Sequence, residues 1–177
     1  ITASANTTDV SCNGGNDGFV TLYISGGITD YIVTAFGFTL PLIGGVDSVA
    51  SSSIFPTGVP AGIYPFVISD ANNCSIADTV IINQPTAITA SATTTDVSCN
   101  GGNDGIANLN LSGGTGTLSA NWGALNPSAL PAGTHTYTIT DANNCVFTDS
   151  VTINQPTAIT ASVTTTDVSC NGGNDGI

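Results

Sequence analysis

Apolar and polar residues alternate along most of the chain, in short runs separated by glycine, proline and asparagine. Val20, Leu22 and Ile24 recur at every second position, and Ala107, Leu109 and Leu111 do the same later in the chain. A period of two residues predicts half-buried β-strands, and no segment has the period of a helix. The pattern therefore predicts an all-β protein. In the second half of the chain, the expected strands are Thr89–Ser98, a strand with Ala107, Leu109 and Leu111 facing inward, a third strand that carries Trp122, a strand with His135, Tyr137 and Ile139 on one face, and Val146–Ile153.

Three copies of one block show that the chain is built from repeats. Residues 1–18 read ITASANTTDVSCNGGNDG, and residues 88–105 and 159–176 differ from this block at one or two positions. A second block, DANNC, occurs at residues 70–74 and 141–145. Repeats of this length predict tandem domains or a solenoid. We expect the chain to be a window cut from a longer array.

The repeats divide the chain into three expected parts. These are repeat 1 at residues 1–85, repeat 2 at residues 86–156, and the first strand and turn of a truncated repeat 3 at residues 157–177. Repeat 1 carries 16 additional residues between positions 25 and 70. Six or seven short strands per repeat are typical of an immunoglobulin-like β-sandwich. The short linkers contain Pro85 and Pro156, so we expect tandem sandwiches arranged head to tail as a rod.

The composition excludes several classes of function. The chain has twelve Asp, no Lys or Arg and one His, which gives a net charge of −12. It has no cations to neutralise phosphates, so we expect neither nucleic-acid binding nor attraction to anionic membranes. No apolar run is long enough for membrane insertion. His135 has no catalytic partners at a recognisable spacing, so we expect no enzyme, and we expect His135 and Trp122 to be packed core residues.

Several motifs resemble a known family. SCNGGNDG followed by an alternating strand, then PAGTHTYTITDANNC and NQPTAITAS, is similar to the SprB repeat of Bacteroidetes gliding-motility adhesins. The resemblance implies a very long, filamentous adhesin at the extracellular cell surface, exported by type IX secretion. Two features depart from the family pattern: His135 stands where the family and Tyr64 have tyrosine, and repeat 1 carries the insertion.

Five cysteines allow three kinds of disulfide. Pairs within a repeat would be Cys12–Cys74 and Cys99–Cys145, and pairs across a linker would be Cys74–Cys99 and Cys145–Cys170, while Cys12–Cys145 would join two repeats. In an immunoglobulin-like order, Cys12 and Cys74 lie at opposite poles about 30 Å apart, whereas a disulfide needs Cα atoms about 6 Å apart. A head-to-tail rod therefore favours Cys12–Cys145. Cys74, Cys99 and Cys170 would then have partners in neighbouring repeats or none.

The junction between two successive repeats, where Cys12 would face Cys145, would also bring together side chains that carry oxygen atoms. We expect that no cofactor is required, and that Ca²⁺ is the candidate metal ion, because it binds six to eight such oxygens. The alternative interpretation is that these are turn residues making local hydrogen bonds. The candidate calcium ligands are Asp9, Asn13, Asn16, Asp17, Asp141, Asn143 and Asn144.

Three segments resemble the Asp-Ser/Thr-aliphatic motif for O-glycosylation in Bacteroidetes. Their candidate acceptors are Ser48, Thr79 and Ser150, of which the last two occupy equivalent positions in the two repeats. The motif is short, and chance matches are frequent in a chain rich in Ser, Thr and Asp.

Two classes of function fit these features. The first is the structural stalk of a long adhesin or surface filament, in which repeats set length and stiffness for gliding motility or surface attachment. The second is an array of carbohydrate-binding modules, with Phe36, Phe38 and Phe55 of the insertion forming the ligand patch. Expected partners are neighbouring repeats, the same chain through lateral self-association along edge strands, and a surface polysaccharide.

Overall fold

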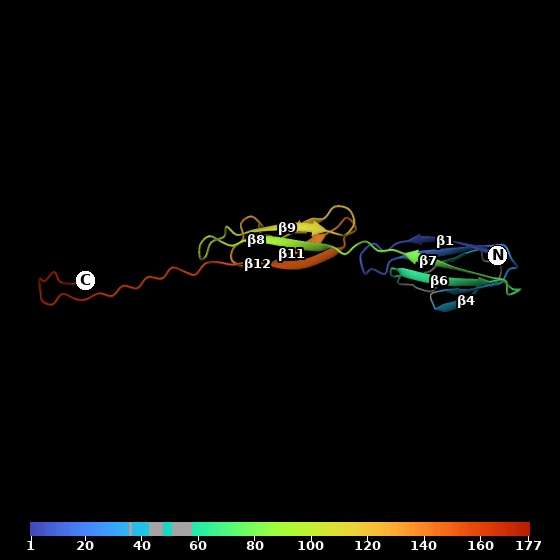
Figure 1. The fold of residues 1–177 in the computed structure, drawn as a ribbon, viewed down its shortest axis with the longest axis horizontal. Coiled ribbons are helices and arrows are strands. Elements are labelled where there is room, and N and C mark those ends of the chain that lie inside the picture. The colour runs from blue at the N-terminus through green and yellow to red at the C-terminus, as the bar shows by residue number, and fades with distance from the viewer. Residues whose placement is uncertain (36, 43–47, 51–57) are drawn as a thin grey trace. The chain divides into compact units, whose positions relative to one another are not determined.

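The chain is all-β in the computed structural model, with twelve strands among the described residues 1–35, 37–42, 48–50 and 58–177 (Figure 1). Of residues 48–50 only the backbone is described. In that described part, no helix is long and apolar enough to cross a membrane. The strands are β1 (Thr2–Thr8), β2 (Phe19–Ser25), β3 (Tyr31–Ala35), β4 (Phe38–Leu42), β5 (Ser48–Ala50), β6 (Gly62–Ser69), β7 (Ser75–Ile82), β8 (Thr89–Thr95), β9 (Ile106–Ser112), β10 (Ser119–Asn121), β11 (Gly133–Thr140) and β12 (Val146–Ile153).

The folded chain divides into two compact units, and each combines segments that are separate in the sequence. The first unit consists of Ile1–Ser91, Asn110–Asn121 and Tyr137–Asp149. The second consists of Ala92–Leu109, Trp122–Thr136 and Ser150–Ile177.

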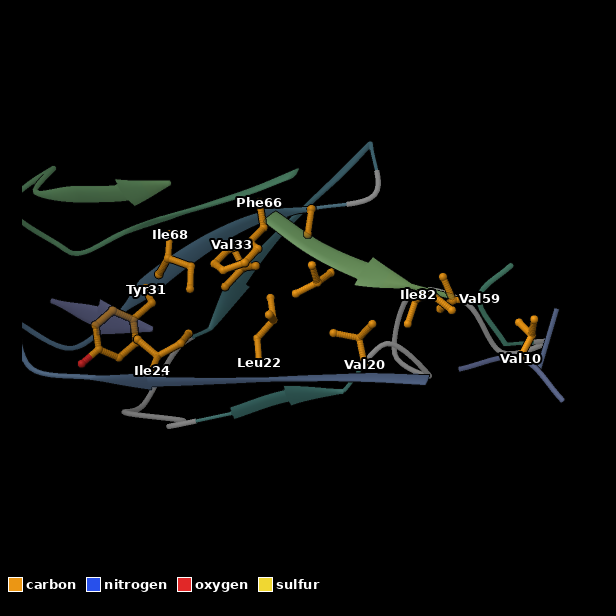
Figure 2. Close-up of a cluster of buried hydrophobic side chains, with 12 residues drawn as sticks. Val10, Val20, Leu22, Ile24, Tyr31, Val33, Val59, Phe66, Ile68 and Ile82 are labelled. Atoms are coloured by element: carbon orange, nitrogen blue, oxygen red, sulfur yellow. The ribbon is translucent and has the colours of Figure 1, made fainter. Parts of the chain in front are cut away.

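Repeat 1 forms two antiparallel sheets that enclose one core. Their strand orders are β1-β2-β5 and β4-β3-β6-β7. Leu22 of β2, Val33 of β3 and Ile68 of β6 are buried in the same cluster, and Figure 2 shows them pointing into one interior. Each such side chain stabilises the fold by about 1.5–3 kcal/mol. Repeat 1 is therefore a β-sandwich, as the alternation predicts.

Repeat 2 forms a β8-β9 sheet and a β10-β11-β12 sheet. His135, Tyr137 and Ile139 are all buried on β11, which confirms the inward face expected for this strand. His135 also keeps the hydrogen bond of the tyrosine that it replaces. Its Nε2 lies 2.8 Å from the Pro131 carbonyl oxygen, as the Tyr64 hydroxyl donates to the Pro60 carbonyl at 2.8 Å.

Trp122 differs from its expected place in a buried third strand. Strand β10 ends at Asn121, and Trp122 is only half-buried. Gly123 follows with a φ of +65°, a left-handed conformation that turns the chain out of the extended region.

The third copy of the block contains no strand, although the sequence predicts its first one. In repeat 1 the corresponding strand pairs with β2 from Thr8↔Phe19 onward. The third copy makes only the equivalent first rung: Thr166 and Ile177 exchange two backbone hydrogen bonds of 2.9 and 3.1 Å. This single pair of backbone hydrogen bonds is not enough to form a strand.

Candidate functional site

The first component of the site is the loop that carries Cys12, here called the first loop (residues 9–18). Asp17 ties it together, because its carboxylate accepts hydrogen bonds from the Ser11 hydroxyl and from the Ser11 N–H. These two bonds lower the pKa of Asp17. The Gly15 N–H donates to the Cys12 carbonyl at 2.9 Å and closes a tight turn around the cysteine.

The last residues of repeat 1 form hydrogen bonds with the first loop. The Asn13 amide donates to the Pro85 carbonyl at 3.0 Å, and the Gly14 N–H donates to the Gln84 side-chain oxygen at 2.8 Å. Gly14 has a φ of +73°, which glycine adopts without strain. The Asn-Gly-Gly sequence after Cys12 therefore positions the cysteine beside the Gln-Pro linker.

The second component is the turn that carries Cys145, here called the Asx turn (residues 141–145). Asp141 Oδ1 accepts hydrogen bonds from the N–H groups of Asn143 and Cys145, both at 2.9 Å. Asp141 Oδ2 accepts a third from Thr115 at 2.8 Å. Asn144 has a φ of +63°, a conformation that asparagine tolerates better than most residues. The DANNC motif, together with the N–H of Thr115, thus fixes the conformation of the turn that carries Cys145.

Burial and hydrogen bonding have opposite effects on the pKa of Asp141. The residue is 5% exposed, and its burial alone would raise the pKa of the carboxyl group. The three backbone N–H groups of Thr115, Cys145 and Asn143 outweigh burial and lower the pKa below its usual value. The hydrogen bonds of this turn therefore favour the ionised form of the Asp141 carboxyl group.

A disulfide joins the two components. Cys12 and Cys145 are bonded, with Cα atoms 5.6 Å apart and a sequence separation of 133. The amide of Asn143 also donates to the Ser11 carbonyl at 3.0 Å. The structure thus contains the cysteine pair that the strand order favours, together with a hydrogen bond that the sequence did not predict.

The other three cysteines, Cys74, Cys99 and Cys170, are free and exposed. Neither pairing within a repeat nor pairing across a linker occurs among them. The partners expected for them in neighbouring repeats stay a prediction.

The candidate calcium ligands are largely engaged with protein groups. Asp9 accepts hydrogen bonds from the Asn83 backbone and side chain, and Asp17 and Asp141 accept those described above. Asn16 is exposed on the first loop, and Asn13 and Asn143 direct their Nδ2 atoms to carbonyl oxygens. Within the described residues, no group of three or more His, Cys, Asp or Glu side chains could hold a metal ion. Calcium binding stays a prediction.

The remaining candidate residues are the glycosylation acceptors and the aromatic patch, and those whose side chains are described lie on the surface. Thr79 on β7 and Ser150 on β12 are exposed, while Ser48 lies in β5, where only the backbone is described. Of the proposed aromatic patch, Phe38 is 52% exposed, and Phe36 and Phe55 lie outside the described residues.

Two segments of the chain match one known family. The family model of the SprB repeat matches residues 4–31 and 91–119, which contain the loops that carry Cys12 and Cys99. The SprB-repeat model thus matches the chain at two places, one in each of the two long repeats. SprB repeats form a structural, adhesin-type family found in Bacteroidetes cell-surface adhesins. The search of curated proteins gave no match.

Sequence reasoning missed two parts of the site. One is the amide of Asn143, which the motif suggested only as a turn residue or calcium ligand. The other is Gly113, where an added Cβ would lie 1.9 Å from the Ala87 carbonyl oxygen. The repeated Gly-Gly pairs at residues 26–27 and 113–114 were a signal for such a close approach, but they read equally well as strand ends.

Proposed function

We propose that this chain is part of the stalk of a long bacterial cell-surface adhesin, and that disulfides between successive SprB repeats limit how far the stalk extends under load. The observation that carries the proposal is the Cys12–Cys145 bond, which joins a first loop of one repeat to the Asx turn of the next. The two SprB repeats support the adhesin and the extracellular setting, where disulfides persist. Gliding motility, surface attachment and type IX secretion belong to this proposal.

The bond changes the path that tension takes through the chain. When the two ends are pulled, force passes from Cys12 directly to Cys145, so the residues between them are bypassed. These residues include all strands from β2 to β11. A stalk built this way keeps most of each repeat folded while it transmits force, which suits an adhesin that is pulled between a cell and a surface.

Single-molecule pulling from the two termini tests the proposal. Under oxidising conditions, we expect no unfolding step that releases residues 13–144. After reduction, the 133-residue separation corresponds to about 440–480 Å of additional extended chain. A Cys12→Ser/Cys145→Ser variant should show the long extension in both conditions. Equal extension of the wild-type chain before and after reduction would contradict the proposal.

A glycan array addresses the competing function. Specific binding that is lost when residues 31–58 are deleted, with the remaining strands intact by circular dichroism, would favour a carbohydrate-binding array over a stalk. We expect no binding that depends on this segment.

A further inference from the structure

Every Asn-Gly dipeptide of the chain lies in the first loop or in one of its two equivalents, residues 96–105 and 167–176. The dipeptides are Asn13-Gly14, Asn100-Gly101 and Asn171-Gly172, each within the same sequence SCNGGNDG. All three are exposed to water. Glycine has no Cβ to shield its nitrogen, so this nitrogen can attack the side-chain carbonyl carbon, Cγ, of the asparagine before it. An Asn-Gly dipeptide is for this reason prone to spontaneous deamidation.

Deamidation needs no reagent other than water. The glycine nitrogen forms a bond to the asparagine Cγ and gives up its proton to solvent, while the side-chain nitrogen takes up a proton and leaves as ammonia. Water then opens the resulting cyclic imide at one of its two carbonyl carbons. One opening gives aspartate in a normal backbone, and the other gives isoaspartate, in which the chain continues through the side chain. In sum, asparagine and water give a carboxylate and ammonium.

The Gln-Pro linker holds both reacting groups of the first loop. The Gly14 N–H, whose nitrogen would attack, donates to the Gln84 side-chain oxygen at 2.8 Å. The Asn13 side-chain nitrogen, which would leave, donates to the Pro85 carbonyl at 3.0 Å. Attack requires Gly14 to lose its proton and the Asn13 side chain to turn towards it, so both bonds must first open. The rate of deamidation then scales with the fraction of molecules in which the loop is open, as hydrogen exchange does.

The linker of the next repeat holds Asn100-Gly101 in the same way. The Asn100 amide donates to the Pro156 carbonyl at 3.0 Å, and the Gly101 N–H donates to the Gln155 side-chain oxygen at 2.9 Å. These lengths are nearly equal to those in repeat 1. Protection of the dipeptide is therefore a property of the repeat and not of a single loop.

Asn171-Gly172 has the same loop without a linker. The Ser169 N–H donates to Asp175 Oδ1 at 3.0 Å inside this loop, and Gly172 has a φ of +82°. The chain has two Gln-Pro segments, and the other two loops engage both. Asn171 therefore serves as a reference, within the same chain, for an Asn-Gly dipeptide that no linker protects.

Deamidation would remove the hydrogen bond that protects the loop. The Asn13 amide is the donor to the Pro85 carbonyl, whereas a carboxylate has no proton to donate and would place negative charge against the carbonyl oxygen. Isoaspartate would also lengthen the backbone of the loop by one carbon atom. A loop that has reacted therefore cannot rebind its linker in the original way.

We propose that Asn13 and Asn100 are latent deamidation sites, which the Gln-Pro linkers keep closed and which react when a linker leaves its loop. Each repeat thereby converts a lasting release of the linker into a permanent change of covalent structure and charge. This inference goes beyond the proposed stalk and does not depend on it.

The test follows the three sites of the intact chain by mass spectrometry. The chain is incubated at neutral pH, and samples taken over time are reduced, digested with chymotrypsin and analysed for aspartate and isoaspartate. The loss of one hydrogen bond raises the open fraction about fivefold, so we expect Asn171 to react at least about fivefold faster than Asn13 and Asn100. In urea the three sites should react at equal rates, because their local sequences are identical. Equal rates in the native chain would overturn the inference.

Two variants separate the linker from any other difference between the loops. Gln84→Ala removes the acceptor of the Gly14 N–H, so it should speed the reaction of Asn13 about fivefold and leave Asn100 unchanged. Gln155→Ala should do the reverse, so each variant is the control for the other. Circular dichroism checks that both variants fold, and if one does not, the native and denatured rates of the wild-type chain decide. A folded Gln84→Ala chain in which Asn13 reacts at the wild-type rate would show that the linker does not protect this site.

Hydrogen exchange measures whether the change is permanent. Asn13→Asp should speed exchange of the Gly14 N–H, because the loop no longer rebinds the linker. Asn171→Asp makes the same change in the loop without a linker and should leave Gly14 unaffected. Unchanged exchange of Gly14 in the Asn13→Asp chain would mean that the linker rebinds after deamidation, and it would overturn the permanent step.

Discussion

Asp141 stabilises the turn that presents Cys145, and it does so only as a carboxylate. Its pKa in the folded chain lies below its usual value of 3.8, because three N–H bonds outweigh burial. A depressed pKa contributes stability above the pKa of the unfolded chain. That stability is lost as the pH falls through the folded-state pKa. Asp70 holds the Cys74 turn in the same way: burial opposes the shift, and N–H groups from Cys74, Ile28 and Asn72 lower its pKa.

We predict that Asp141→Asn lowers the melting temperature at pH 7 and flattens the loss of stability below about pH 3.8. The asparagine removes the charge that the three N–H groups stabilise. Thermal unfolding followed by circular dichroism between pH 2 and 7 measures both effects. The control is Asp167→Asn, which makes the same charge change at an exposed position outside any strand. An identical pH profile for Asp141→Asn and wild type would refute the prediction.

Gly113 offers a second test at the scale of one residue. It has a φ of +81°, and an added Cβ would lie 1.9 Å from the Ala87 carbonyl oxygen. Gly101 has a similar φ of +77°, but its Cβ would meet nothing within 4 Å. Gly101→Ala should therefore cost only the left-handed conformation, about 1–2 kcal/mol, and Gly113→Ala should cost clearly more. Urea denaturation of both variants gives the difference, and equal costs would show that the close approach does not constrain the fold.

At the scale of the strands, alternation was sufficient to predict which face of β2 is buried. Leu22 is 2% exposed, and Tyr23, the next residue of β2, is 44% exposed. We expect Leu22→Ala to destabilise repeat 1 by about 2–5 kcal/mol, since it opens a cavity in the core. Tyr23→Ala on the opposite face should cost much less. Urea denaturation compares the two, and similar losses would mean that β2 does not separate a core face from an exposed face.

The sequence predicted strand type better than strand pairing or strand ends. It placed Val146–Ile153 correctly as a strand, because Val151 and Ile153 continue a clear period of two. It extended the strand before Cys99 to Ser98, whereas β8 ends at Thr95. The reason is tertiary: Asp96 accepts the N–H of Asn154, 58 residues away, at 2.8 Å. A local sequence pattern cannot predict a hydrogen bond between residues so far apart in the chain.

The sequence predicted which two cysteines of the site pair, but it did not predict the contacts that hold the first loop beside the linker. Pole positions in an immunoglobulin-like order were enough to favour Cys12–Cys145 over pairs within a repeat. The contacts of Gln84 and Pro85 with the first loop depend on where the linker runs after β7, which the sequence alone does not fix. The NQPTAITAS motif was recognisable only as a repeated linker.

At the scale of the whole molecule, the disulfide closes a loop with a sequence separation of 133 residues. In the chain-entropy account, a loop of this length stabilises the folded state by about 5 kcal/mol. We therefore predict that reduction lowers the midpoint of urea denaturation. The Cys12→Ser/Cys145→Ser variant should not respond to reductant, because Cys74, Cys99 and Cys170 are free already. An unchanged midpoint on reduction of the wild-type chain would contradict the prediction.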